Sequence, residues 1–180
     1  MRVIAGSLGG RRLKAPAGTI TRPTSDRVRE ALFGMLGDID GARVLDLFAG
    51  TGALGIEALS RGASLAVFVE QDARVTRVLR ENLESLGIGE GSAEVRRSGA
   101  LGALRSAKAR KETYDLVFID PPYRRAHEWG ADLSAILPSL LEPGARIVAE
   151  SDRRAPLQLA FEIERERRYG DTSITIHRHP

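Results

Sequence analysis

The stretch from Arg43 to Arg61 constrains the fold of this chain more than any other part of its sequence. An apolar run, RVLDLF, leads into a glycine-rich turn and then into a helical pattern that Gly62 ends. Gly50, Gly52 and Gly55 have the G-x-G-x-x-G spacing of a turn that joins a strand to a helix and binds a nucleotide. The pattern therefore predicts a strand, a turn and a helix that form part of a parallel α/β sheet.

Strand and helix patterns alternate along the rest of the chain. Strands are predicted near 64–70, 93–97, 114–119 and 145–150, and helices near 72–86, 100–109 and 129–141, with an earlier helix from Thr24 or Ser25 to Gly37. Two last runs, 159–167 and 172–177, alternate like an antiparallel pair. This order predicts an α/β fold: a Rossmann-like, mostly parallel seven-stranded sheet with helices on both faces and an antiparallel C-terminal hairpin. At 180 residues the chain suits one such domain and is too short for two.

Two prolines follow the apolar strand pattern at 114–119, in the sequence YDLVFIDPPY. Pro121 and Pro122 remove backbone donors and force Asp120 and Pro121 into extended conformations. The resulting corner offers a carboxylate and a carbonyl as acceptors, followed by the ring of Tyr123. These groups suit a planar base that carries an exocyclic amino group, so we predict that Asp120, Pro121, Pro122 and Tyr123 form the catalytic corner. A simple turn after a buried strand is the alternative.

Two acidic residues accompany the glycine turn. Asp46 ends the strand before it, and Glu70 lies 20 residues after Gly50 at the end of the next strand, where a ribose-binding acid is expected. This spacing also fits a nicotinamide dehydrogenase. However, the Asp46 carboxylate would repel a pyrophosphate and would suit a cationic, amino-acid-like group. Hydride transfer also has no use for the corner at Asp120.

Positive charge is concentrated at the N-terminus. Residues 1–30 hold seven basic and two acidic residues, a net charge of +5, whereas the whole chain has +3. Residues 1–22 are predicted to form a basic β-hairpin extension that binds RNA, followed by the main domain at 23–180, because clustered Arg and Lys capture phosphates. A solvated arm is the alternative. The candidate RNA contacts are Arg2, Arg11, Arg12, Lys14, Arg27 and Arg29.

Composition excludes several classes of protein. The chain has no cysteine, which rules out disulfides and cysteine-based metal sites, and it has no apolar run of membrane-spanning length. No signal peptide is recognisable, so a cytoplasmic protein is expected. The three histidines, His127, His177 and His179, lack metal-ligand spacing, and no metal is predicted. A single compact domain makes a monomer the expected state.

The motifs together resemble a known family. DLFAGTGALG at 46–55, Glu70 and DPPY at 120–123 resemble class I methyltransferases that use S-adenosylmethionine and act on amino groups. RVIAGSLGGRRL at 2–13 and RPTSDRVREALF at 22–33 make the chain similar, from Arg2 to about Ile176, to the bacterial RsmD family. This resemblance implies methylation of the 2-amino group of one guanine in small-subunit (16S) ribosomal RNA, as naked RNA or within an assembled subunit.

The resemblance also implies roles for individual residues. Those expected to contact the methionine end, the ribose and the adenine of the cofactor are Asp46, Phe48, Gly50, Thr51, Gly52, Glu70 and Gln71. Arg22 and Thr24 would close over the cofactor from the N-terminal side. Many relatives hold the adenine with Asp or Asn after the third strand. This chain has Ser98-Gly99-Ala100 there, so Ser98 and the backbone near Ala100 are expected to serve instead.

Two further interpretations stay open at the level of sequence. The DPPY motif also occurs in DNA adenine methyltransferases, so DNA is a possible substrate. A noncatalytic RNA-binding module is the alternative from a different class. Titration with S-adenosylhomocysteine and with NAD separates a methyltransferase from a nicotinamide-binding protein.

Overall fold

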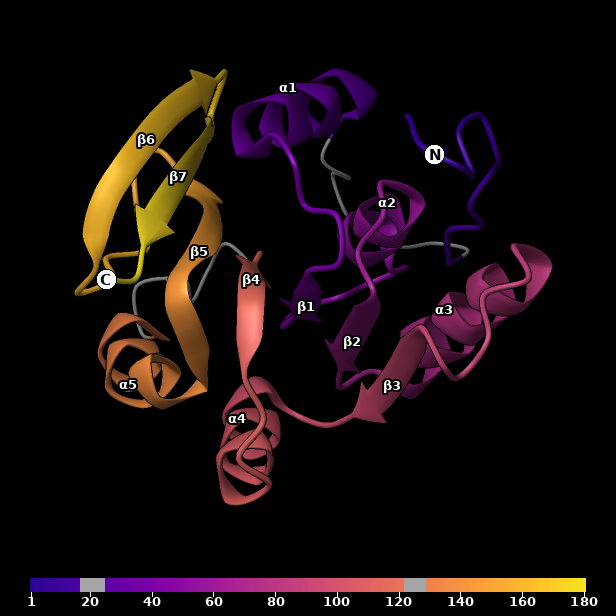
Figure 1. The fold of residues 1–180 in the computed structure, drawn as a ribbon. Helices are drawn as coiled ribbons and strands as arrows, with labels where there is room; N and C mark the ends of the chain where they lie inside the picture. Colours follow the sequence, from indigo (N-terminus) through magenta and orange to yellow (C-terminus); the bar gives the residue numbers. More distant parts are fainter. Residues whose placement is uncertain (17–24, 122–128) are drawn as a thin grey trace.

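One twisted sheet runs through the computed structural model, which describes residues 1–16, 25–121 and 129–180 (Figure 1). The strands within these ranges are β1 (Arg43–Asp46), β2 (Leu65–Glu70), β3 (Ala93–Arg97), β4 (Tyr114–Ile119), β5 (Leu141–Asp152), β6 (Glu162–Tyr169) and β7 (Thr172–Arg178). They lie in the order β3-β2-β1-β4-β5-β7-β6. Neighbours in the run β3-β2-β1-β4-β5 pair in parallel, whereas β7 pairs antiparallel with both β5 and β6. The predicted sheet and its C-terminal hairpin are confirmed.

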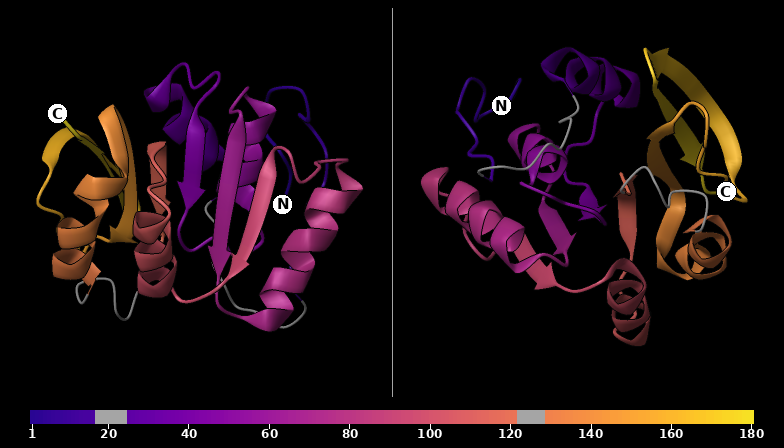
Figure 2. Two further views of the ribbon diagram at one scale, coloured as in Figure 1. Left: turned by 60° about the horizontal axis from the view of Figure 1, so that its bottom comes forward. Right: turned by 180° about the vertical axis from the view of Figure 1, so that it is seen from behind.

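Helices cover both faces of this sheet (Figure 2). The helices α1 (Asp26–Leu36), α2 (Ala53–Ser60) and α3 (Ala73–Ser85) lie on one face, and α4 (Ala100–Ala109), α5 (Gly130–Ile136) and the 3₁₀ turn η2 (Leu137–Leu140) lie on the other. Successive residues of the central strands enter opposite layers, as Val44 and Leu45 do in β1. Central strands buried on both sides explain the apolar runs in the sequence. None of the helices in the described ranges is long and apolar enough to cross a membrane.

Local signals account for several helix ends. The Ser25 hydroxyl accepts a hydrogen bond from Val28 N–H (3.3 Å) and caps α1, and Gly37 ends that helix with a φ of +67°. The predicted helix at 129–141 is shorter than expected: α5 ends at Ile136 and continues as the 3₁₀ turn η2. Pro138 lies at the start of this turn and lacks the N–H that a continued α-helix requires.

Residues 1–16, called the N-terminal segment from here on, fold back on themselves with a single antiparallel β-bridge between Arg2 and Arg12, and they contain no regular strand. Val3 N–H donates to Arg11 O, and Gly10 N–H donates to Val3 O (both 2.9 Å). Val3 and Leu13 are buried in the same hydrophobic core as α1, α2 and α3. The N-terminal segment is therefore packed against the main domain. The predicted boundary at residue 22 lies outside the described residues.

Side chains of α2 hold the backbone of the N-terminal segment. The buried Glu57 carboxylate accepts hydrogen bonds from Ile4 N–H (2.6 Å) and Ala5 N–H (3.0 Å). The Ser60 hydroxyl accepts from Leu8 N–H (2.9 Å) and donates to Ala5 O. Because these groups replace the water that the backbone would otherwise bind, the segment is held in one position on the helices.

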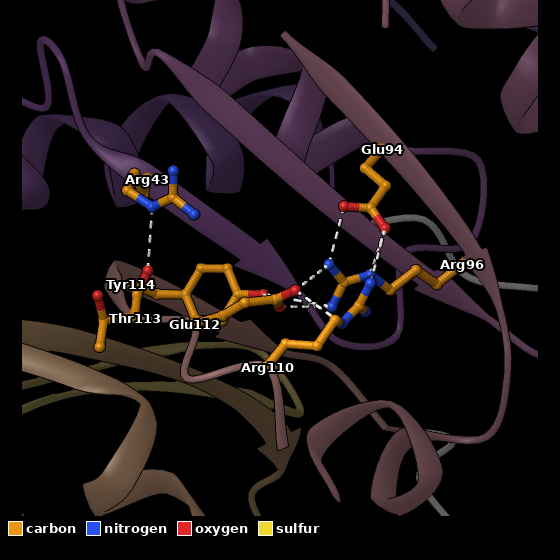
Figure 3. A network of polar contacts seen from close by, with 7 residues as sticks. All are labelled: Arg43, Glu94, Arg96, Arg110, Glu112, Thr113 and Tyr114. Carbon is orange, nitrogen blue, oxygen red and sulfur yellow. Dashed lines mark hydrogen bonds and ion pairs between the residues drawn. The ribbon is translucent and has the colours of Figure 1, made fainter. Parts of the chain in front are cut away.

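A polar network joins the edge strand β3 to the start of β4 (Figure 3). The Arg96 guanidinium donates two hydrogen bonds to Glu94 (both 2.8 Å) and two to Glu112 (2.8 and 2.9 Å). The Tyr114 hydroxyl also donates to Glu112 (2.7 Å). The Arg96 side chain is only 11% exposed, and its hydrogen bonds hold the pKa of Glu94 below its ordinary value. One guanidinium therefore neutralises two carboxylates across β3 and β4.

Replacing Arg96 with methionine should lower the free energy of unfolding by about 2–3 kcal/mol, because it removes two hydrogen bonds from the Glu112 carboxylate, whose side chain is only 16% exposed. Arg110→Met is the matched control. Its guanidinium also contacts Glu112 (3.0 Å), but its side chain is 48% exposed, so a loss below about 1 kcal/mol is expected. Urea unfolding of both variants measures the difference. Equal losses would contradict the role given to Arg96.

Candidate active site

The predicted site residues gather at one edge of the sheet. The strand order reverses between β1 and β4, and ligands of open α/β sheets bind at the carboxyl ends of strands at such a point. Asp46 is the last residue of β1, Glu70 is the last residue of β2, and Asp120 directly follows β4. Leu47 N–H donates to Phe118 O (3.0 Å), which keeps β1 and β4 paired up to this edge. The sheet therefore brings the three acids predicted from sequence to one place.

The glycine turn after β1 needs its glycines for two different reasons. Gly50 and Gly52 have φ values of +54° and +86°, which other residues adopt only with strain. A Cβ atom at Gly52 would lie 2.4 Å from Leu79 Cδ1, so packing against α3 requires glycine there. A Cβ atom at Gly50 would meet no atom within 4 Å. The turn is thus tightly packed against the helix beneath it and open above Gly50.

Glu70 holds the turn from the neighbouring strand. Its carboxylate accepts hydrogen bonds from Gly50 N–H (3.0 Å) and from Asp72 N–H (2.8 Å). The Glu70 side chain therefore lies directly beside the turn, half-buried at the carboxyl end of β2. A ligand at this edge would meet an acid whose position two backbone donors already determine.

Asp46 is the most deeply buried of the three acids, with 2% of its surface exposed. Its Oδ2 accepts a hydrogen bond from Gly55 N–H (3.0 Å) at the start of α2. The pKa of Asp46 is raised to about 7: burial is the main cause, the hydrogen bond from Gly55 N–H opposes the rise, and the negative charge of Glu70 adds to it. A nearby cation would offset the energetic cost of keeping Asp46 ionised, because it favours the charged form of a buried carboxylate.

Asp120 lies beside two other carboxylates. Burial raises its pKa well above the ordinary value, and the charges of Glu150 and then of Asp46 raise it further. Ile119 pairs with Ala149, so Asp120 and Glu150 follow on neighbouring strands. Pro121 is buried next to them. The raised pKa of Asp120 depends on which carboxylates the paired strands bring together, so it is a finding of the structure.

Residues predicted for the adenine side lie at the ends of β2 and β3. Gln71 is exposed, and its Oε1 lies 3.9 Å from the position that a Cβ atom of Gly99 would occupy. Ser98 N–H donates to Glu70 O (3.1 Å), and the Ser98 hydroxyl donates to Gly99 O (3.1 Å). Ala100 is buried as the first residue of α4. These positions adjoin Glu70, with the Ser98 hydroxyl already bonded to the backbone.

Other predicted residues are placed only in part. Phe48, in the turn after β1, packs edge-on against Trp129 with 5.4 Å between the ring centroids. This contact brings the start of α5 next to the glycine turn. Pro122, Tyr123, Arg22 and Thr24 lie outside the described residues.

The predicted RNA contacts divide into exposed and buried residues. Arg2 pairs with Asp26 (3.0 Å), Lys14 pairs with Glu81 (2.9 Å), and Arg11 donates to Ser85 O (2.8 Å), all at the surface. Arg12 and Arg27 are exposed. These five side chains keep their charges at the surface, where a polyanion would meet them.

The structure contradicts the prediction that Arg29 contacts RNA. Arg29 was expected to point away from the core and to contact RNA, but its side chain is 0% exposed. Its guanidinium donates to Arg2 O (2.5 Å) and to Asp26 (2.8 Å), and burial lowers its pKa. The cause is the N-terminal segment, which packs over this face of α1. Arg29 is therefore removed from the RNA contacts.

Sequence reasoning also missed polar residues that hold the site together. Asn82 in α3 is buried and donates to Thr51 O (3.0 Å) in the glycine turn. Its position three residues after Leu79, on the apolar side of the helical pattern, was the available signal. Glu150 gave no such signal, because its proximity to Asp120 arises from the pairing of β4 with β5.

Comparisons with known proteins agree with this architecture. The family model described as conserved hypothetical protein 95 matches residues 1–178. YlbH of Bacillus subtilis, named as a candidate rRNA methyltransferase, is 42% identical over 99% of this chain and 98% of its own. The ribosomal RNA small subunit methyltransferase D of Escherichia coli K12 is 46% identical over 69% of this chain, a match that spans 61% of that protein.

Solved structures show the same fold. The Escherichia coli protein yhhF, described as a candidate methyltransferase, has a TM-score of 0.83 at 36% identity, covering 99% of this chain and 97% of its own. An RNA methyltransferase of Salinibacter ruber in complex with S-adenosylhomocysteine has a TM-score of 0.66 at 21% identity, covering 88% and 94%. That second likeness concerns the fold alone. With the match to the family model across 178 residues, these comparisons establish that the chain belongs to the conserved hypothetical protein 95 family, the RsmD-like family that its sequence resembles.

Proposed function

We propose that this protein transfers a methyl group from S-adenosylmethionine to the 2-amino group of a guanine in small-subunit ribosomal RNA. The observation that carries the proposal is the position of Asp120. It follows β4 at the point where the strand order reverses, beside Asp46 and the open glycine turn. Relatives in the same family that are named as methyltransferases of small-subunit ribosomal RNA support this reaction.

The residues at the sheet edge fit S-adenosylmethionine. Asp46 is a buried carboxylate with a raised pKa, which suits the cationic methionine end. Gly50 leaves open space above the turn where a ligand can approach the backbone, and Glu70 lies at the strand end where a ribose-binding acid is expected. The Salinibacter ruber enzyme holds S-adenosylhomocysteine on this fold, which supports the choice of cofactor. When bound, the cofactor would supply an activated methyl group on its sulfonium sulfur.

Asp120 and Pro121 would orient the acceptor amine. The exocyclic nitrogen of guanine is a poor nucleophile because its lone pair is delocalised into the ring. Hydrogen bonds from its two N–H groups to the Asp120 carboxylate and the Pro121 carbonyl would direct that lone pair toward the methyl group. As the methyl carbon bonds to the nitrogen, its bond to the sulfonium sulfur would break and leave a neutral thioether; the nitrogen would then become acidic, and Asp120 would accept its proton. Tyr123 would stack on the base, which must leave its helix to reach the site.

The proposal extends to the partner and its setting. The substrate is 16S ribosomal RNA, held within a small subunit or an assembly intermediate, and the enzyme acts as a cytoplasmic monomer. The absence of cysteine suits the reducing cytoplasm, and the basic N-terminal segment suits structured RNA. Residues 1–22 would thus serve mainly the substrate, apart from Arg22, which would close over the cofactor, and residues 23–180 would serve mainly the cofactor and the chemistry.

Mass spectrometry of nucleosides tests the reaction directly. The purified protein is incubated with S-adenosylmethionine and either naked 16S ribosomal RNA, small subunits from cells that lack this gene, or duplex DNA. N2-methylguanosine in the RNA or in the subunits is the expected product. Methyladenine in the DNA, or no transfer to any substrate, would contradict the proposal.

Arg12→Glu should weaken RNA binding without changing cofactor affinity. Arg12 is exposed on the N-terminal segment, and loss of one phosphate contact should lower the slope of log affinity against log salt by about 1. Arg167→Glu is the matched control. Arg167 lies on β6, at one edge of the sheet, whereas the N-terminal segment contacts α3 near β3, at the other edge. RNA affinity is measured by filter binding at several salt concentrations. An equal loss in both variants would mean that Arg12 acts only through net charge.

A further inference from the structure

Asn82 makes three hydrogen bonds that link two functional parts of the chain. It lies in α3 and is 0% exposed. Its Oδ1 accepts from Lys14 N–H (2.8 Å), and its Nδ2 donates to Lys14 O (3.2 Å) and to Thr51 O (3.0 Å). One side chain therefore touches the N-terminal segment and the glycine turn at the same time.

The pattern of bonds determines how the amide is oriented. Lys14 presents both its N–H and its C=O to the carboxamide, so the oxygen of Asn82 must face the N–H and the nitrogen must face the C=O. The second N–H of Nδ2 is then directed at Thr51 O. Rotation of the amide by half a turn would place its nitrogen against the Lys14 N–H and its oxygen against the carbonyl oxygens of both Lys14 and Thr51. A docked Lys14 therefore favours the one amide orientation in which Nδ2 can donate to Thr51 O.

The bond to Thr51 bears on the shape of the glycine turn. Gly50 N–H is held by Glu70, and Gly52 N–H donates to Ala49 O (2.7 Å). The peptide unit between Thr51 and Gly52 is planar, so the carbonyl bond to Asn82 also fixes the direction of Gly52 N–H. Asn82 therefore supports the turn from α3, the helix against which Gly52 also packs.

We propose that Asn82 is a positioning residue that couples docking of Lys14, near the end of the N-terminal segment, to cofactor binding at the glycine turn. This inference rests on the proposed function, since it assigns S-adenosylmethionine to that turn. When Lys14 is docked, the carboxamide is held in the orientation that supports Thr51. Conversely, a cofactor that orders the turn stabilises the docked Lys14, because coupling between two sites is reciprocal.

A pair of variants separates this role from simple structural support. Asn82→Ala removes the contacts to Lys14 and Thr51. Ser60→Ala removes contacts to Leu8 and Ala5 of the same N-terminal segment, and Ser60 has no hydrogen bond to the glycine turn among the described residues. At a temperature where melting curves show both variants folded, isothermal titration should give an S-adenosylhomocysteine affinity about tenfold lower for Asn82→Ala and within twofold of wild type for Ser60→Ala.

Hydrogen exchange of the wild-type protein gives a second measurement that needs no variant. S-adenosylhomocysteine should slow exchange of the Lys14 amide, which donates to Asn82. Unchanged exchange at Lys14 would overturn the inference, as would unaltered affinity in Asn82→Ala or an equal loss in Ser60→Ala. If the wild-type protein does not bind S-adenosylhomocysteine, the proposed function fails, and the inference fails with it.

Discussion

Asp120→Ala should lower kcat for methyl transfer by about 10³-fold or more while leaving the affinity for S-adenosylhomocysteine within about threefold of wild type. The carboxylate is the proposed acceptor for the amine and for its proton, whereas the residues proposed to bind the cofactor lie at and after the ends of β1, β2 and β3. Single-turnover transfer of labelled methyl to small subunits measures the rate. Calorimetric titration measures the affinity.

Asp115→Asn is the matched control for Asp120. It changes the same residue type at the opposite end of β4 from Asp120, where the Asp115 carboxylate accepts a hydrogen bond from Arg43 N–H (2.8 Å). Activity close to wild type is expected from this variant. A substantial rate in Asp120→Ala would show that the amine is oriented by other groups. A matching loss in Asp115→Asn would show that the effect comes from the strand as a whole.

Asp46→Asn should reduce affinity for S-adenosylhomocysteine by about 10²-fold while making the ligand-free protein more stable. The loss of affinity is expected because the variant removes the charge that we propose faces the cationic end of the cofactor. The gain in stability follows from the pKa of about 7, because the folded protein must carry a buried charge above that pH. Unfolding in urea should show a gain on the order of 3 kcal/mol at pH 8.

The pH dependence distinguishes this explanation from a general packing effect. The folded pKa of Asp46 lies above its unfolded value of 3.8, so its charge destabilises the folded state progressively as pH rises from about 4 to about 7. The gain from Asp46→Asn should therefore nearly vanish at pH 4. Wild-type affinity for S-adenosylhomocysteine should rise as pH increases through about 7, and this rise should be absent in Asp46→Asn. A stability gain that is equal at pH 4 and pH 8 would contradict the electrostatic cause.

The main elements could be predicted because their signals are local. The strand at Tyr114–Ile119, the strand at Ala93–Arg97 and the helix at Ala100–Ala109 have the predicted bounds. Their apolar spacing follows from alternation in strands and from the helical repeat, and neither depends on distant residues. The end of α5 was misjudged because Pro138 permits a 3₁₀ turn where a longer helix was expected.

Polar residues inside the protein were harder to predict. Arg29 was expected at the surface because charged side chains are rarely buried without a partner. It is buried because the N-terminal segment supplies Arg2 O as an acceptor, 27 residues earlier in the chain. Asn82 and Glu57 satisfy backbone groups of the same segment, 68 and 52–53 residues away along the chain. No local pattern carries information about such partners.

The amino-acid sequence by itself determined the alternation of strands and helices, the glycine turn, and the arrival of Asp46, Glu70 and Asp120 at strand ends. Parallel strands with covered faces place those ends along one edge, so local periodicity was sufficient. Only the tertiary structure decided which polar groups are buried and what they hold, including the raised pKa of Asp46 and the link from Lys14 through Asn82 to Thr51. Burial and hydrogen-bond partners depend on which distant segments meet, and that is settled only when the chain packs.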